Sequence, residues 1–218
     1  MIRTADLFDL RRSAAGKYLE EFPYPWEALP GIKGMILELM KYLGEEYIPG
    51  EFGVWVHKTA RIAATAFLEG PCIIGANTEV RHCAFIRGSV LVGENCVVGN
   101  SVEVKNAILF DGVQVPHFNY VGDSILGYKA HMGAGAVTST VKSDSSLVAV
   151  KSGGRQMATG LKKCGAMLGD FVEVGCNAVL NPGTVVGRNS VIYPASCVRG
   201  VVPANSIWKN NGAIVGKR

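Results

Sequence analysis

Hydrophobic residues recur every six positions along most of the chain. Starting at Val56, every sixth residue as far as Phe110 is aliphatic or aromatic. A period of six fits neither the 3.6-residue period of an amphipathic helix nor the two-residue alternation of a strand. It is typical of a hexapeptide-repeat solenoid, in which each hexad forms a short strand and a turn. The sequence therefore predicts an all-β solenoid, a parallel β-helix whose aliphatic residues point into a common interior.

The repeat is interrupted in ways that divide the chain. Its phase slips near Pro116, and the segment 138–163 is dominated by Gly, Ser, Lys and Arg instead of hexads. An insertion of this length in a solenoid is usually an excursion on one face, often the functional face. We expect a β-helix over 51–203 with an inserted loop at 138–163, followed by a C-terminal tail at 204–218.

The first 50 residues follow a different pattern. Thr4 and Ser13 are candidate helix caps, and the apolar residues of 32–43 have the i, i+3, i+4 spacing of an amphipathic helix. The sequence predicts a short α-helical N-terminal segment over 1–50. It can pack on the end or flank of the solenoid or bind a partner, and we favour packing.

Composition narrows the possible partners. The net charge is +4, which is too small to favour nucleic acid but suits an anionic small molecule. No apolar run approaches the roughly 20 residues that span a bilayer, and the N-terminus lacks the apolar segment of a signal peptide. We expect a cytoplasmic protein with neither a nucleic-acid nor a membrane partner.

The six cysteines suggest neither disulfides nor a metal site. None pair as C-x-x-C, and each lies in an aliphatic or glycine-rich stretch. Their spacing lacks the four-ligand clusters of structural zinc. We expect buried, reduced thiols and no metal.

Polar residues that could carry chemistry are concentrated between 102 and 135. A solenoid packed with side chains has no internal pocket, so an active site must lie on its outside, between subunits or beneath a loop. The candidates in this stretch are Lys105, Asn106, His117, Tyr120 and His131. The imidazoles among them can act as general bases at neutral pH.

A longer motif in the same stretch resembles a known family. A lysine, Lys105, precedes by twelve residues a histidine of the form H-x-x-Y-x-G-D, formed by His117, Tyr120, Gly122 and Asp123. This pattern resembles the acetyltransferase half of the bifunctional enzyme that makes UDP-N-acetylglucosamine. The family's phosphate-binding arginine falls on Arg87 without a gap. A K-x5-G-D-x4-G pattern begins at Lys163, once the longer insertion is allowed. The resemblance covers 54–203.

The resemblance implies a function. His117 is expected to take a proton from the 2-amino group of glucosamine 1-phosphate, so that the amine can attack acetyl-CoA. Arg87, Lys105 and Lys163 are expected to hold the sugar phosphate, and Tyr120 a sugar hydroxyl or the phosphate. For each residue a surface or turn role remains the alternative. The resemblance also implies a left-handed coil and a homotrimer with the site between subunits.

Three expected contacts depart from the family's residues. His131 stands where the family has a sugar-contacting asparagine, and Cys176 replaces a serine whose amide faces the acetyl group. Pro194 takes the place of a small residue in the acetyl-CoA groove and has no N–H to donate. Ala134 is the remaining residue expected to contact acetyl-CoA. The acceptor sugar, and transfer to nitrogen or oxygen, therefore stay open.

Other functions remain possible from the sequence alone. A non-catalytic sugar-phosphate-binding scaffold would keep the cations without turnover. A zinc hydratase of the carbonic anhydrase type needs three metal histidines, yet His57, His82, His117 and His131 contain no H-x4-H pair. A nucleotidyltransferase label would rest on similarity only, because the first 50 residues hold no glycine-rich nucleotide loop.

Overall fold

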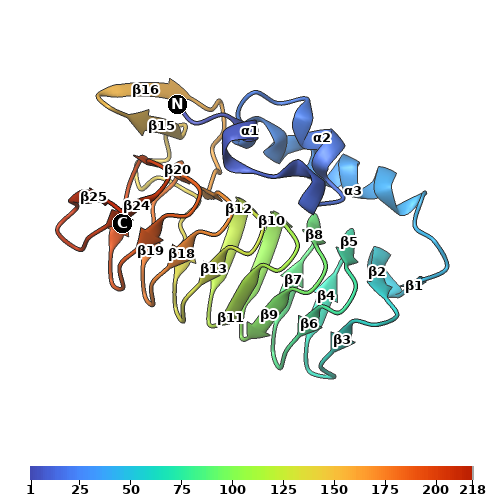
Figure 1. The fold of residues 1–218 in the computed structure, drawn as a ribbon. Helices are drawn as coiled ribbons and strands as arrows, with labels where there is room; N and C mark the ends of the chain where they lie inside the picture. The colour runs from blue at the N-terminus through green and yellow to red at the C-terminus, as the bar shows by residue number, and fades with distance from the viewer. Residues whose placement is uncertain (218) are drawn as a thin grey trace.

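The computed structural model describes residues 1–217 and shows a parallel β-helix with a layer of short helices along one side (Figure 1). Each coil contributes one short strand to each of three ladders, and equivalent strands pair in parallel. The predicted fold, a β-helix of hexapeptide repeats with a short helical N-terminal segment, is confirmed.

The three ladders form three faces. The first face consists of β4 (Phe67–Glu69), β7 (Phe85–Arg87), the first halves of β10 (Glu103–Leu109) and β12 (Tyr120–Leu126), β14 (Val137–Thr138), β19 (Val179–Leu180) and β22 (Cys197–Val198). The second face consists of β2 (Val54–His57), β5 (Cys72–Ile74), β8 (Val90–Val92), the second halves of β10 and β12, β17 (Ala166–Leu168), β20 (Thr184–Val186) and β23 (Val201–Val202). The third face consists of β3 (Arg61–Ile62), β6 (Glu79–Val80), β9 (Val97–Asn100), β11 (Gln114–His117), β13 (His131–Met132), β18 (Glu173–Val174), β21 (Val191–Ile192) and β24 (Ser206–Trp208).

The regular coil consists of three full hexads, but two successive coils are each one residue shorter. Val104 pairs with Ile86, three full hexads earlier, whereas Leu109 pairs with Val92 and falls one residue short of that spacing. The missing residue lies at Lys105–Asn106, where the backbone turns from the first to the second face with Asn106 at φ 45°. The same shortening recurs one coil later.

The second shortened turn is Gly122–Asp123, where Asp123 has a positive φ, as Asn106 has in the first. Our expectation of a phase slip near Pro116 was therefore wrong. The chain passes through Pro116 with a regular hexad, because the buried Val115 and Val121 on either side are one hexad apart. His117 lies at an ordinary corner between the third and first faces.

Phe110 also departs from the predicted pattern. The interior residue of its coil is Leu109, which pairs with Val92, and Phe110 follows it at a position that is glycine in five other coils and His57 or Pro203 in the two end coils. These glycines, by their backbone hydrogen bonds, are Gly75, Gly93, Gly127, Gly169 and Gly187. The Phe110 ring instead packs on Phe8, with centroids 5.1 Å apart. Phe110 therefore fastens the N-terminal segment to the solenoid.

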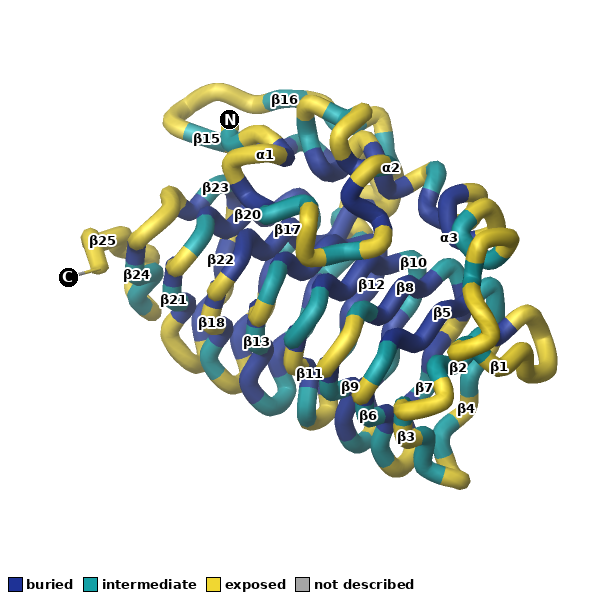
Figure 2. The backbone as a smooth tube through the Cα atoms, turned by 45° about the vertical axis from the view of Figure 1, so that its right-hand side comes forward, coloured by how far each residue is buried: buried dark blue, intermediate teal, exposed yellow. Residues whose placement is uncertain are grey.

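The N-terminal segment lies along the second face. It consists of α1 (Thr4–Leu7), α2 (Gly16–Glu20), α3 (Ile32–Met40) and 3-10 helices at Leu10–Arg12 and Pro25–Gly31. In α3, Ile32, Met35 and Ile36 are buried, at the helical spacing that the sequence predicts. In Figure 2 this layer contains buried segments, drawn dark blue, and lies beside the strands of the second face. The segment thus supplies the second apolar layer that the outward residues of this face require.

Asp170 holds this segment in place. Its buried carboxylate accepts the N–H of Asp9 at 2.7 Å and that of Tyr128 at 2.8 Å, and its own N–H donates to the Leu7 carbonyl. Arg188 lies 3.3 Å from the same carboxylate. Burial raises the pKa of Asp170, against the effect of these donors. The role of Asp170 is therefore to hold the N-terminal segment on the solenoid.

The segment between β14 and β17 leaves the solenoid at the corner between the first and second faces. It forms a hairpin of β15 (Ala149–Ser152) and β16 (Arg155–Ala158) around Gly153–Gly154. At the two ends of the solenoid, β1 (Tyr47–Pro49) pairs antiparallel with β2, and β25 (Ile214–Gly216) with β24. A further 3-10 helix spans Glu51–Gly53. The last coil continues to Trp208, beyond the boundary predicted at 203.

The cysteine prediction was wrong for half of the thiols. Cys72, Cys96 and Cys164 are buried, and burial raises the pKa of each. Cys83, Cys176 and Cys197 are exposed, because they occupy corners or outward strand positions. All six are free thiols. No helix within residues 1–217 is long and apolar enough to cross a membrane.

Candidate functional site

The first-to-second-face corner carries a cluster of charges, which we call the lysine corner (Arg87, Lys105 and Asp123). The register of β7 on β10 stacks Lys105 one coil beyond Arg87, as their spacing of three hexads predicts. Each cation has a carboxylate partner. Arg87 lies 2.6 Å from Glu103, which raises the pKa of the guanidinium, and Lys105 Nζ lies 3.2 Å from Asp123 Oδ2.

Asp123 matches the H-x-x-Y-x-G-D motif, but no role for its side chain was predicted from the sequence. Its carboxylate is buried and also accepts from Asn106 Nδ2 at 2.9 Å. The carboxylate therefore fixes both residues of the shortened turn below it. The signal available in the sequence was the break in the hexad phase at each of the two shortened turns, which we had expected near Pro116 instead.

Tyr120 approaches the lysine corner along the first face. It faces outward, like Gly122 two residues later, and a Cβ at Gly122 would lie 2.5 Å from the Tyr120 hydroxyl. The missing side chain of Gly122 therefore makes room for the phenol. Because Gly122 pairs with Lys105, the hydroxyl lies over the strand position next to the lysine.

Lys163 lies in the chain that returns from the insertion to the same corner. Two residues later, the Gly165 N–H donates to the Asp123 carbonyl at 2.8 Å. The Lys163 side chain is exposed and makes no ion pair with the described residues. The structure thus brings the backbones of Arg87, Lys105 and Lys163 to one corner.

A second set of predicted residues lies at the third-to-first-face corner, which we call the histidine corner (His117, Ala134, Cys176 and Pro194). These residues occupy the same turn position in four successive coils. The His117, Ala134 and Cys176 carbonyls each accept an N–H from the next coil, with distances of 3.0, 2.8 and 2.8 Å. The catalytic residue and the acetyl-CoA contacts predicted from the resemblance therefore form one column.

This column presents unpaired hydrogen-bonding groups. No described residue accepts the backbone N–H of Ala134 or of Cys176. The Pro194 nitrogen has no hydrogen, so the column offers two such donors and then stops. N–H groups fixed in this way can stabilise negative charge on a carbonyl oxygen.

The His117 side chain is exposed, and among residues 1–217 its ring has no hydrogen-bond partner. Its backbone N–H donates to Asn119 Oδ1 at 3.1 Å, and the buried Asn119 amide donates to the Gly133 and Ala136 carbonyls. Asn119 therefore fixes the turn without using the imidazole.

His131 lies away from both corners. It faces outward on the third face, in line with Gln114 and Glu173, and its Nδ1 lies 2.8 Å from Glu173 Oε2. Within one chain the structure does not bring His131 together with the lysine corner. Among the described residues, no three His, Cys, Asp or Glu side chains gather as metal ligands would.

The two corners border the same face. From His117 the chain turns at Phe118–Asn119 and runs along β12 to Gly122, beside Lys105. Five residues at about 3.3 Å each place the corners at most roughly 16 Å apart. A substrate lying across the first face can therefore reach both.

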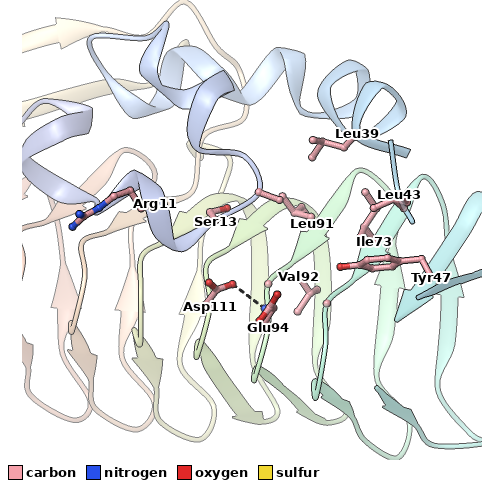
Figure 3. A pocket seen from close by; sticks show the side chains of 13 residues that line it. Arg11, Ser13, Leu39, Leu43, Tyr47, Ile73, Leu91, Val92, Glu94 and Asp111 are labelled. Carbon is pink, nitrogen blue, oxygen red and sulfur yellow. Dashed lines mark hydrogen bonds between the residues drawn. The ribbon is translucent and has the colours of Figure 1, made fainter. Parts of the chain in front are cut away.

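A separate pocket of about 340 Å³ lies under the N-terminal segment (Figure 3). Leu39, Leu91 and Val92 line its apolar part. Asp111 and Glu94 line its polar end, where the Glu94 N–H donates to Asp111 at 2.9 Å. None of the residues predicted from the sequence to bind substrate lines this pocket.

Comparisons with known proteins confirm the resemblance found in the sequence. Residues 68–153 match the family model described as the GMPPB C-terminal domain. The bifunctional sugar-1-phosphate nucleotidylyltransferase/acetyltransferase of Sulfurisphaera tokodaii is 34% identical over 100 residues, which cover 46% of this chain and 25% of that protein. The bifunctional protein GlmU of Methanococcus maripaludis is also 34% identical, over 46% of this chain and 24% of the relative. The chain thus spans about a quarter of the length of these relatives.

Among solved structures, AntD, an N-acyltransferase from Bacillus cereus, overlaps 80% of this chain and 92% of its own, with 14% identity and a TM-score of 0.40.

Proposed function

We propose that the chain is a CoA-dependent acetyltransferase that moves an acetyl group from acetyl-CoA to the amine of an amino sugar phosphate. The observation that carries this proposal is the histidine corner, where a free imidazole lies below two unpaired N–H groups in adjacent coils. A base and two oxyanion donors are the groups that acyl transfer requires. The similarity to nucleotidylyltransferase/acetyltransferases supports the same reaction class.

In the proposed reaction the amine nitrogen attacks the thioester carbonyl while a ring nitrogen of His117 takes the amine proton. The carbonyl oxygen gains negative charge, and the N–H groups of Ala134 and Cys176 stabilise it. The C–S bond then breaks, CoA leaves, and its sulfur takes up a proton. Acetyl-CoA is thus a co-substrate, and the chain contributes the base and the donors.

The lysine corner is proposed to hold the phosphate. Arg87 can offer a forked pair of donors, and Lys105 and Lys163 compact charges. Glu103 and Asp123 now pair with two of these cations, so an entering phosphate must displace or share these carboxylate contacts. Tyr120, whose hydroxyl lies over the strand position next to Lys105, is placed to hold a sugar hydroxyl or the phosphate. On this proposal His131 contacts the sugar only from a neighbouring subunit.

A homotrimer is part of the proposal. The first face carries exposed apolar side chains at its surface or edge, including Phe67 at 54% and Phe118 at 60% exposure. Such a row on the face between the two corners suits contact with a second copy. The site would then lie in the groove between subunits of a cytoplasmic enzyme.

The test is release of CoA thiol from acetyl-CoA with a panel of amino sugar phosphates, glucosamine 1-phosphate first. The proposal predicts turnover with at least one of them and its loss in His117→Ala. His82→Ala is the matched control, because His82 occupies the same turn position two coils earlier and is also exposed. Turnover that survives His117→Ala would refute the assignment of the base.

A second candidate is a sugar-phosphate-binding scaffold without turnover. Pro194 favours it, because the column of N–H donors ends there. Calorimetry with glucosamine 1-phosphate distinguishes the two. If glucosamine 1-phosphate binds but no acceptor in the panel gives release of CoA thiol, the chain is a scaffold.

A further inference from the structure

The insertion forms a basic pocket at the C-terminal end of the solenoid, away from the histidine corner. The pocket measures about 490 Å³ and lies between the β15–β16 hairpin and the last coil. Its lining consists of Lys151, Ser152, Gly153, Gly154, Arg155, Gln156, Arg199, Val201, Trp208 and Ile214. In Figure 1 the hairpin lies above the orange and red coils that form the other wall.

The charge of this pocket has one sign. Lys151, Arg155 and Arg199 line it, and its lining contains no carboxylate. None of the three forms an ion pair within residues 1–217, and the only side-chain hydrogen bond of Arg199 there joins its guanidinium to Asn181 Oδ1 at 3.1 Å. Three unneutralised cations around one hollow attract an anion with more than one negative charge.

The opposite wall is apolar and contains an aromatic ring. Trp208 is half-buried at the end of β24, with Val201 and Ile214 beside it in the lining. An indole offers a flat surface on which a planar ring can stack. The pocket therefore suits a ligand with a phosphate-rich end and an aromatic end.

The hairpin is fixed against the coil, so the cations are held near the ring. Val150 on β15 is fully buried. Gly200 has φ 81°, and a Cβ at this position would lie 2.7 Å from the Lys151 carbonyl oxygen. The backbone of Lys151 thus passes directly over the corner from which Arg199 projects.

We propose that this pocket binds a nucleoside diphosphate, with the phosphates at Lys151, Arg155 and Arg199 and the base against Trp208. Two sources share this chemistry, the nucleotide of a sugar nucleotide and the ADP portion of CoA. The site is separate from the residues assigned to acetyl transfer, and its test requires no turnover.

The test uses the full chain and Trp208 as its own reporter. Trp26 is buried, and Trp55 lies on β2 at the other end of the solenoid. Titration with ADP or UDP at low salt is expected to change the tryptophan fluorescence, and Trp208→Phe is expected to abolish that change. Calorimetry on Arg199→Gln is expected to show affinity weakened about tenfold or more. Lys33→Gln on α3 removes an equal charge far from the pocket and should bind as the parent does.

Three results would overturn the proposal. The first is no binding of ADP or UDP at millimolar concentration. The second is an affinity for ADP and UDP that is unchanged in an Arg199→Gln, Lys151→Gln double variant. The third is an affinity for inorganic diphosphate equal to that for the nucleotides. Tighter binding of UDP than of ADP supports the site and identifies a sugar nucleotide as the source. Tighter binding of CoA than of either, weakened in Arg199→Gln, supports the site and identifies CoA; CoA binding that Arg199→Gln leaves unchanged belongs to the histidine corner and counts against the pocket.

Discussion

Lys105 and Asp123 form an ion pair between two coils, with Nζ 3.2 Å from Oδ2, and each lies at a corner that is one residue short. The pair is poorly exposed, at 21% for the lysine side chain and 7% for the aspartate. Asn106 donates to the other oxygen of the same carboxylate. The break in the repeat and the concentration of charge are therefore one feature, because the shortened turns bring these groups together.

Asp123→Asn tests this relationship. The variant keeps an acceptor for Asn106 but leaves the Lys105 ammonium without its counter-charge. We expect the free energy of unfolding in urea to fall by about 1–3 kcal/mol. Glu38→Gln breaks an exposed helix pair and should change stability little. An Asp123→Asn protein as stable as the parent would show that the pair is not structural.

The fold was predictable because each hexad places one aliphatic residue in the interior, and this requirement leaves a period in the sequence. The positions of the irregularities were not predictable in the same way. Counted from Val104, Phe110 satisfies the six-residue spacing and Leu109 does not, yet the pairing with Val92 shows that Leu109 is the interior residue. Hydrophobicity alone cannot separate a residue inside the coil from one buried beneath the N-terminal segment.

Arg87→Ala tests the proposed phosphate site by kinetics. The guanidinium should contribute to binding of the sugar phosphate and not to proton transfer, so KM for the acceptor should rise about tenfold or more while kcat changes little. Arg61→Ala, an exposed arginine on the third face, is the control. A fall in kcat with unchanged KM would contradict a binding role.

His117→Ala should show the reverse pattern. Loss of a general base lowers kcat by about 10²–10⁴ and leaves KM nearly unchanged, because the phosphate contacts remain. Steady-state kinetics with the best acceptor measures both constants. A rise in KM alone would assign His117 to binding instead.

The carboxylate partners of the predicted cations could not be predicted from the sequence. Glu103 lies far from Arg87 along the chain, and only the length of the coil brings the two side chains onto neighbouring strands of one face. His131 was assigned to the sugar by its place in the motif, yet its outward direction on the third face depends on the register of β13. A residue's type is visible in the sequence, but its face depends on the register.

The pH dependence of stability is expected to include a contribution from Asp111. Burial raises the pKa of its carboxyl, and the nearby Glu94 charge adds to this, against the Glu94 N–H bond that lowers it. The folded state therefore holds the proton more tightly than the unfolded state, in which the pKa of an aspartate is about 3.9. Stability relative to Asp111→Asn should fall as pH rises from about 4 through the folded pKa, and then level off.

Urea unfolding of both proteins across this range measures the difference. Asp144→Asn is the contrasting variant, because the backbone and side-chain hydrogen bonds of Ser146 lower the pKa of Asp144. The stability that the Asp144 carboxylate contributes is present above its unfolded pKa and is lost as the pH falls through its folded pKa. If the stability of the parent relative to Asp111→Asn instead rises with pH, the assigned direction of the Asp111 pKa shift is wrong.

Gly200→Ala should displace the hairpin that forms one wall of the basic pocket. Gly200 has φ 81°, and its added Cβ would meet the Lys151 carbonyl oxygen at 2.7 Å, so both the backbone conformation and the contact resist a side chain. We expect faster amide exchange in β15 and β16 and weaker binding of ADP, with the interior strands unchanged. Gly34→Ala is the matched control. It lies in α3 with nothing within 4 Å of the added carbon, and helix propensity predicts a stabilisation of about 0.5–1 kcal/mol. If Gly200→Ala leaves hairpin exchange unchanged, the contact between Lys151 and the last coil does not hold the pocket together.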